Sequence, residues 1–173
     1  MTRRFSLLIS WGCTALLVLI PLAALYFLIN IHAFALFAQK NIGLAIDWGT
    51  VVAWQWYTLW GVTFLYLSIG LVGLNCLRRP FANFARGELF NLTNSRDLQR
   101  FSILLLVQAL AKPLHFAIAS LLLSANHSAG NKMLSISMGS SEVRMIALAL
   151  VFGVVSNLLI EGGRLQSENR QFI

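Results

Sequence analysis

Charged residues are missing from two long stretches of this chain. No acidic or strongly basic residue occurs in the 35 residues between Arg4 and Lys40, or in the 30 residues between Asp47 and Arg78. A helix of about 20 apolar residues crosses a hydrocarbon core about 30 Å thick, so each stretch is long enough to span a bilayer. Charged residues make up 11% of the chain, against roughly a quarter in a soluble domain. The sequence therefore predicts a membrane protein.

Four apolar segments are suited to cross the membrane as helices: residues 7–28, 51–74, 101–123 and 145–160. The first follows Arg3 and Arg4, as the core of a signal peptide would. Its apolar run is about twice the usual signal-peptide length of roughly 7–15 residues, which favours an uncleaved anchor. The sequence predicts an all-α fold, an integral membrane four-helix bundle in a single domain of residues 1–173.

The distribution of basic residues predicts the orientation, because cytoplasmic loops retain Lys and Arg. With both termini inside, nine arginines are cytoplasmic: Arg3, Arg4, Arg78, Arg79, Arg86, Arg96, Arg100, Arg164 and Arg170. Only three basic residues are then outside: Lys40, Lys132 and Arg144. We therefore expect a multi-pass protein of the bacterial cytoplasmic (inner) membrane, with a cytoplasmic connection at 78–100 and outer loops at 30–50 and 124–144. The apolar segment 30–50 either lies on the outer surface or extends the first helix.

Aromatic residues are concentrated where the second span begins, at Trp48, Trp54, Trp56, Tyr57 and Trp60. Such side chains suit the headgroup layer, because the ring is apolar and its N–H or O–H group stays wet. A ligand cage is the alternative interpretation.

Small residues on the later spans indicate close helix approach, notably Gly70, Gly73 and Gly153. Packing within the chain explains them more simply than an interface with a partner does.

The two segments expected in the cytoplasm are more patterned than spacers need to be. Phe90, Asn94, Leu98 and Phe101 recur at spacings of four, four and three, which is one stripe of a helix. The third helix is therefore expected to begin in the cytoplasm. We predict that a contact surface for a partner includes these residues: Phe84, Arg86, Gly87, Phe90, Asn94, Gly163 and Asn169.

The pattern of Gly87, Phe90, Asn94 and Leu98, together with the ending Glu161 to Ile173, resembles the bacterial membrane proteins grouped as domain of unknown function 2975. The four-span layout extends the resemblance over nearly the whole chain. This family has no established activity. Some members are encoded beside small helix-turn-helix regulators, so the resemblance implies such a regulator as a candidate partner.

Lys112 and His115 are the sharpest anomaly, because they lie within the third span on either side of Pro113. A lysine at the centre of a span costs about 2.5–3.5 kcal/mol on insertion scales. We expect no carboxylate at matching depth, so Lys112 would use backbone carbonyls, Gln108, Asn157 or snorkelling of its stem. Lys112, His115 and Asn157 are therefore candidate ligand or partner residues. The alternative is that Lys112 and His115 are structurally tolerated.

Catalytic and metal-binding patterns are missing from the sequence. Cys13 and Cys76 form no CxxC motif, and no hydrolase, zinc-protease or phosphate-loop motif occurs. His32 and His115 are predicted at different depths, and His127 falls in an outer loop, so we expect no haem or metal. The basic residues flank apolar spans and do not form a patch with stacking aromatics, so we expect no direct nucleic-acid binding.

The leading hypothesis is therefore a non-enzymatic, regulatory or adaptor membrane protein without a cofactor. It would bind membrane lipids and present segments 78–100 and 161–173 to a protein partner. A small-solute or lipid binding or transport unit at Lys112 and His115 is the alternative, as is an accessory subunit of a larger membrane complex. The oligomeric state is left open.

Overall fold

In the computed structural model of the protein, every element that the described residues form is a helix. The structure describes residues 2–41, 48–87, 92–126, 134, 136 and 139–170, without the side chains of 2, 3, 40, 41 and 165–170. Its elements are α1 (Thr2–Ile29), α2 (Ile31–Asn41), the 3-10 turn η1 (Trp48–Thr50), α3 (Ala53–Phe84), α4 (Leu92–Ser124) and α5 (Ser140–Arg170). Within the described residues, α1, α3, α4 and α5 are long and apolar enough to cross a membrane. The predicted all-α fold with four membrane-length helices is confirmed.

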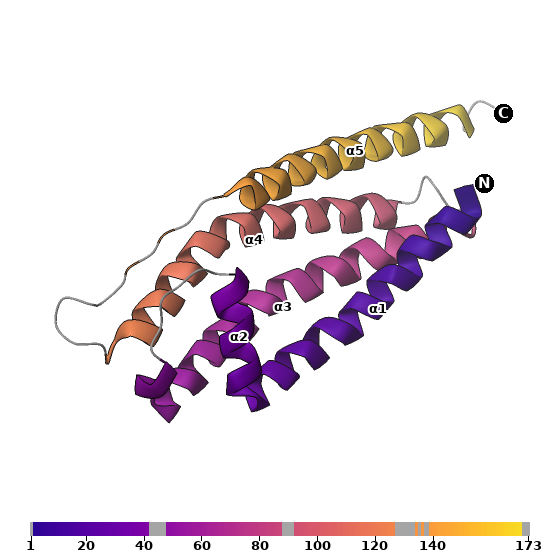
Figure 1. Cartoon of the computed structure of the whole chain (residues 1–173). Coiled ribbons are helices and arrows are strands. Elements are labelled where there is room, and N and C mark those ends of the chain that lie inside the picture. The colour runs from indigo at the N-terminus through magenta and orange to yellow at the C-terminus, as the bar shows by residue number, and fades with distance from the viewer. Residues whose placement is uncertain are drawn as a thin grey trace.

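The long helices lie side by side in the order α1, α3, α4, α5, each antiparallel to the next (Figure 1). α3 packs against both α1 and α4, and α5 packs against α4. The beginning of α1 and the end of α5 lie at the same end of the bundle (Figure 1). We call this the inner end, and the opposite end the outer end.

The chain turns back sharply after α1. α2 begins after Asn30 and runs back beside α3 (Figure 1). Phe34 of α2 packs edge-on against Trp48, Trp56 and Trp60, with ring centroids 5.8, 5.3 and 5.7 Å apart. Because this packing draws α2 into the bundle, the interpretation that segment 30–50 extends the first helix is wrong.

Two of the five aromatic residues expected at the membrane surface form the core instead. Trp56 is 7% exposed and Trp60 is 4% exposed, whereas Trp54 and Tyr57 are 54% and 68% exposed. Trp56 and Trp60 are four residues apart and share the face of α3 that packs against α1 and α2. Trp56 Nε1 also donates to the Leu28 carbonyl at the end of α1, at 3.0 Å. The interfacial prediction is therefore wrong for Trp56 and Trp60.

A buried glutamine joins α3 to α4 at the outer end. Gln55 is 0% exposed. Its Oε1 accepts from the Val52 N–H at 2.8 Å and from Asn126 Nδ2 at 2.9 Å, and its Nε2 donates to the Leu122 carbonyl at 2.6 Å. The bond to Val52 serves the first turn of α3, as the N3 residue of a capping box does.

Small residues set the spacing of the helices, as predicted. A Cβ at Gly73 would lie 3.6 Å from Leu104 Cβ of α4, and a Cβ at Gly153 would lie 3.1 Å from Ser102 Oγ. Ser102 Oγ donates to the Ala149 carbonyl of α5 at 2.7 Å. These contacts are within the chain, so no partner is needed to explain the glycines.

α4 bends near its middle, and α5 begins beside the bend (Figure 1). Pro113 lies inside α4 and lacks the N–H that would bond to the carbonyl four residues earlier, which is a common cause of a helix bend. α5 therefore follows the inner half of α4 and leaves the outer half of α4 without this neighbour.

Candidate functional site

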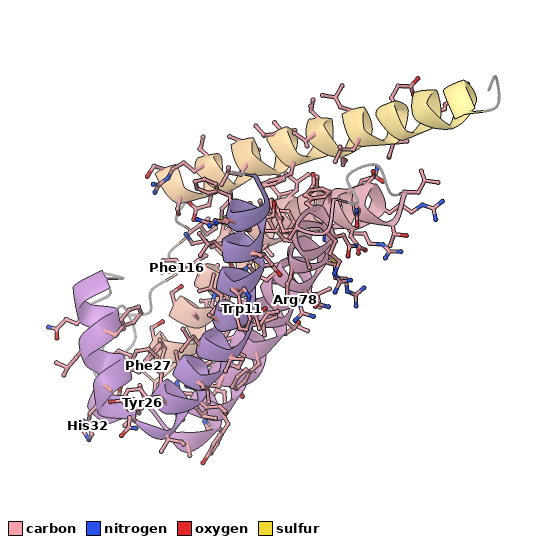
Figure 2. The ribbon with its side chains drawn as sticks, turned by 90° about the vertical axis from the view of Figure 1, so that its right-hand side faces the viewer. Trp11, Tyr26, Phe27, His32, Arg78 and Phe116 are labelled. Atoms are coloured by element: carbon pink, nitrogen blue, oxygen red, sulfur yellow. The ribbon has the colours of Figure 1, made fainter. Side chains whose placement is uncertain are left out.

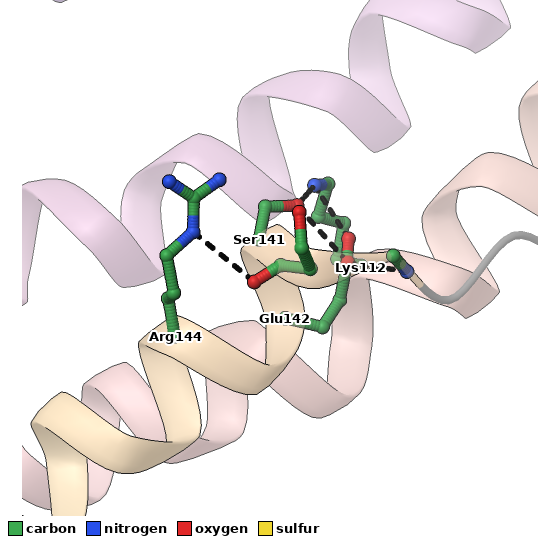
Figure 3. Close-up of polar contacts among 6 residues, drawn as sticks. Lys112, Ser141, Glu142 and Arg144 are labelled. Carbon is green, nitrogen blue, oxygen red and sulfur yellow. Dashed lines mark hydrogen bonds and ion pairs between the residues drawn. The ribbon is translucent and has the colours of Figure 1, made fainter.

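Lys112 of α4 forms an ion pair with Glu142 in the first turn of α5. Its Nζ lies 2.5 Å from Glu142 Oε1 and donates to Ser141 Oγ at 2.6 Å (Figure 3). The side chain of Glu142 is 3% exposed, and that of Lys112 is 39% exposed. Lys112 lies twelve residues before the outer end of α4 at Ser124, about 18 Å along the helix. The pair therefore lies at the level of the middle of α4, where α5 begins, with Glu142 covered and Lys112 partly exposed.

The Glu142 carboxylate also stabilises the start of α5. Its Oε2 accepts from the Gly139 N–H at 2.7 Å and from Ser141 Oγ at 3.0 Å. An acidic side chain in the first turn satisfies a free backbone N–H and interacts favourably with the helix dipole. Arg144 points away from the pair, and its Nε donates to the Ser140 carbonyl at 3.1 Å (Figure 3).

The expectation that no carboxylate would lie at the depth of Lys112 is wrong. It assigned Glu142 to an outer loop, because the fourth span was expected to begin at residue 145. α5 begins instead at Ser140, beside the middle of α4. Ser141 and Glu142 are therefore the site residues that the sequence reasoning missed. The available signal was the acidic residue three positions after Gly139, which is typical of a helix N-terminus.

His115 packs against α3, whereas Lys112, three residues earlier on α4, pairs with residues of α5. The His115 ring stacks on Tyr66 of α3, with centroids 4.8 Å apart and planes inclined by 22°. His115 Nε2 lies 3.1 Å from Thr63 Oγ1, which itself donates to the Leu59 carbonyl at 2.8 Å. The Thr63 hydroxyl has one proton, which it donates to the Leu59 carbonyl. His115 Nε2 is therefore assigned as the donor, and Thr63 Oγ1 as the acceptor, of the contact between them.

Asn157 does not belong to this polar cluster. It is exposed and lies fifteen residues after Glu142, about 22 Å along α5. The predicted use of Asn157 as a partner of Lys112 is therefore wrong. The cluster consists of Gln108, Lys112 and His115 on α4, Thr63 and Tyr66 on α3, and Ser141 and Glu142 on α5.

The predicted contact surface is only partly available to a partner. Arg86 is exposed, Phe84 and Gly163 are half-buried, and Gly87 ends the turn after α3 with φ of 89°, a left-handed value that favours glycine. Phe90 lies outside the described residues, as does the side chain of Asn169.

Asn94 is not on the surface. It is 1% exposed, and its Oδ1 accepts from Asn83 Nδ2 of α3 at 2.7 Å. Leu98 and Phe101 of the same stripe are 2% and 8% exposed. The stripe is therefore the face by which α4 packs against its neighbours, and the inclusion of Asn94 in a contact surface is wrong.

Exposed arginines are concentrated at the inner end. We use the term inner surface for the exposed residues of 78–87, 92–100 and 161–164. Its exposed charged residues are Arg79, Arg86, Arg96, Arg100, Glu161 and Arg164. Asp97 is buried, and its Oδ1 lies 3.4 Å from Arg100 Nη1. Five exposed arginines against one exposed carboxylate make the described inner surface strongly cationic.

The described histidines and cysteines are dispersed. Figure 2 shows His32 beside Tyr26 and Phe27 near the junction of α1 and α2, whereas Arg78 lies farther along the bundle. His115 is held by α3, and His127 is outside the described residues. Cys13 and Cys76 are buried free thiols. Among the described residues, no three His, Cys, Asp or Glu side chains gather as metal ligands would.

Comparison of the chain with family models, with curated proteins and with solved structures finds no match. The resemblance to domain of unknown function 2975 therefore stays a prediction.

Proposed function

We propose that this protein is a non-enzymatic membrane protein that binds an acidic protein partner through its inner surface. The observation that carries the proposal is the gathering of exposed arginines from α3, α4 and α5 at one end of the bundle. Complementary charge speeds encounter with an acidic partner and disfavours basic ones. No chemical step is needed for such a role.

The orientation that suits this role places the inner surface in the cytoplasm of a bacterium. Arginines flanking apolar spans favour the cytoplasmic side of the inner membrane. In that orientation, the beginnings of α1 and α4 and the ends of α3 and α5 face the same compartment, because they share one end of the bundle. A soluble cytoplasmic protein then has access to all of these helix ends at once.

The family resemblance implies a helix-turn-helix regulator as a partner class. Such a regulator suits the cationic inner surface on one condition. Its DNA-binding face is basic, so it would have to contact the inner surface with an acidic face on its other side. Such a regulator held at the membrane would be removed from most of its DNA sites. This gives the protein a regulatory or adaptor role without an active site.

The test is co-purification after cross-linking in cells, in a mild detergent, with three inner-surface arginines changed together. We expect Arg86→Glu, Arg96→Glu and Arg164→Glu to abolish recovery of a stoichiometric partner. The matched control changes the same three residues to lysine, which keeps the charge and should keep most of the binding. Arg78, Arg79 and Arg100 are left in place to preserve the orientation signal.

Two further measurements make the result decisive. A reporter fused after residue 173 shows whether the glutamate variant keeps its orientation, and membrane abundance shows whether it folds. Equal recovery of the partner with the glutamate and lysine variants would refute a charge-dependent surface. Recovery of no stoichiometric partner with the parent protein would refute protein binding altogether.

A small-solute or lipid binding or transport unit is the second candidate. It is favoured by one observation: polar side chains of α3, α4 and α5 meet inside the bundle, where they are expensive in a bilayer. Intramembrane polar residues often mark a ligand or ion path, but here Lys112 and Glu142 satisfy each other. That mutual pairing makes a structural role sufficient and places this candidate second.

The two candidates are distinguished by their variants in a strain that lacks the native gene. If the polar cluster acts on a solute, Lys112→Leu with His115→Leu abolishes function at unchanged membrane abundance, and the arginine variants remain active. If the inner surface acts, the outcomes are reversed. An accessory subunit of a larger complex would behave as the first candidate does, with a membrane protein as the recovered partner.

A further inference from the structure

A groove runs along α3 between α1 and α4. Both helices pack against α3, but they make at most slight contact with each other. A cavity of about 270 Å³ lies between the three helices. We call it the α3 groove; its lining includes Ile20, Leu67, Leu71, Leu74, Leu104 and Leu105.

The chemistry of the lining suits hydrocarbon. Of the residues that line the groove, Gln108 alone has a polar side chain, and it bonds to Tyr66. Gly70 and Gly73 contribute no side chain of their own, and side chains of α4 lie over them: Gln108 over Gly70, and Leu104 and Phe101 over Gly73. An apolar cavity of about 150 Å³ is known to stay dry and to take up benzene or xenon. The larger α3 groove therefore has room for an apolar ligand.

The dimensions of the groove fit one lipid leaflet and not a helix. On α3 the lining runs from Leu67 to Leu74, about 10 Å along the helix axis, and Arg78 lies about 6 Å farther along the same helix. Half of a hydrocarbon core about 30 Å thick is about 15 Å. A helix of that length and about 10 Å across would need roughly 1,200 Å³, far more than the cavity provides. A single acyl chain is therefore the better occupant.

Arginines continue the lining of the groove at its inner mouth. Leu67, Leu71, Leu74 and Arg78 recur at spacings of four, three and four, so they lie on one face of α3. Arg100 lies four residues before Leu104, on the same face of α4 and one residue before Phe101, where the lining on α4 begins.

Both guanidinium groups have donors left for a ligand. Arg78 is half-buried. The side chain of Arg100 is 66% exposed, and its 3.4 Å contact with Asp97 uses only Nη1. A guanidinium group presents five N–H donors and suits the geometry of a phosphate.

We propose that the α3 groove binds one anionic phospholipid of the inner leaflet, with an acyl chain in the cavity and the phosphate at Arg78 and Arg100. Basic sites between membrane helices on the cytoplasmic side recognise anionic headgroups by the same chemistry. The site shares Arg100 with the inner surface proposed for a protein partner, but its cavity lies between the helices, and the three arginines changed in the partner test are not part of it.

The test is native mass spectrometry of the purified protein in a non-ionic detergent. Phosphatidylglycerol and phosphatidylcholine with identical acyl chains are added in equal amounts. We expect the parent protein to retain one phosphatidylglycerol molecule in preference to phosphatidylcholine. Arg78→Gln and Arg100→Gln should each reduce that preference about fivefold, because each arginine contributes one charge at the headgroup. Leu105→Phe should reduce retention of both lipids, because the larger ring occupies the cavity.

Matched controls separate the groove from general effects. Leu110→Phe makes the same change on α4 at a site that is 59% exposed and outside the groove, so lipid retention should match that of the parent protein. Arg86→Gln removes a charge beyond the mouth of the α3 groove, so this variant should keep the preference for phosphatidylglycerol over phosphatidylcholine. Unfolding temperatures establish that each variant is folded, and Ile20→Phe replaces Leu105→Phe if the latter is not. Equal retention of the two lipids by the parent protein, or equal retention by Leu105→Phe and Leu110→Phe, would overturn the proposal.

Discussion

Replacing Gln55 with leucine should loosen the outer end of the bundle. Gln55 is fully buried, and its amide joins the first turn of α3 to the Leu122 carbonyl of α4 and to Asn126. Leucine has a similar size but neither donates nor accepts. The variant therefore removes three hydrogen bonds and leaves the Val52 N–H without the partner that it has in the parent protein.

The magnitude follows from these contacts. Each hydrogen bond contributes about 0.5–1.5 kcal/mol net, so three contribute about 1.5–4.5 kcal/mol. Two of the groups keep a second, longer contact: the Leu122 carbonyl with the Ala125 N–H at 3.4 Å, and Asn126 Nδ2 with the Thr50 carbonyl at 3.3 Å. We therefore expect a loss of about 2–3 kcal/mol in the free energy of unfolding. For a chain of this size that corresponds to about 4–12 °C in the unfolding temperature.

The assay is thermal unfolding in detergent, followed by intrinsic tryptophan fluorescence. Gln99→Leu is the matched control, because Gln99 is exposed on α4, and it should change the free energy of unfolding by less than about 0.5 kcal/mol. Asn126→Ala should destabilise the parent protein more than it destabilises Gln55→Leu, since the bond between the two side chains is already lost there and only the 3.3 Å contact with the Thr50 carbonyl remains. An unfolding temperature of Gln55→Leu within 2 °C of the parent value, a threshold set at about half of the smallest expected shift, would refute the reasoning.

Three further predictions test the arrangement of the helices. Glu142→Gln should lower the unfolding temperature more than Lys112→Leu combined with Glu142→Leu does, because the single change leaves a lysine without its counter-charge inside the bundle. Gly153→Leu should separate α5 from α4 and lower the unfolding temperature more than Gly153→Ala does, because a Cβ at this position already lies in tight contact, 3.1 Å from Ser102 Oγ, and leucine adds a larger side chain there. Reporter fusions should place residue 173 inside and an insertion at residue 130 outside.

These predictions have distinct outcomes that would contradict them. An unfolding temperature of Glu142→Gln equal to or above that of the double leucine variant would show that the ion pair does not satisfy Lys112. Equal unfolding temperatures for Gly153→Leu and the parent would show that α4 and α5 are not in close contact at Ser102. A reporter at residue 173 on the outer side would reverse the orientation and remove the basis for a cytoplasmic partner.

The membrane-length helices could be predicted because their signal is local. A run of apolar residues without charge is visible in the sequence alone, and the helices lie where those runs are. Their ends were less accessible: the stripe from Phe90 to Phe101 predicted that α4 begins before the span 101–123, as it does at Leu92, but the start of α5 at Ser140 is earlier than the span 145–160 suggests. Helix ends depend on capping contacts and on neighbouring helices as much as on hydropathy.

The candidate site was only half predictable for the same reason. The sequence singled out Lys112 and His115, because ionisable groups within an apolar span stand out against their neighbours. It did not single out Glu142, whose place beside Lys112 depends on where α5 starts and on how α4 bends. The same pattern of residues that made Asn94 conspicuous turned out to mark a packing face.

The sequence by itself determined that this chain forms four long apolar helices, and it predicted their direction, because both depend on composition and charge along the chain. Only the tertiary structure decided which polar and aromatic groups are exposed or paired. Trp60 is buried while Trp54 is exposed, and Lys112 meets Glu142 from thirty residues away. Such outcomes depend on contacts between helices, and those follow from how the helices bend, begin and pack against one another.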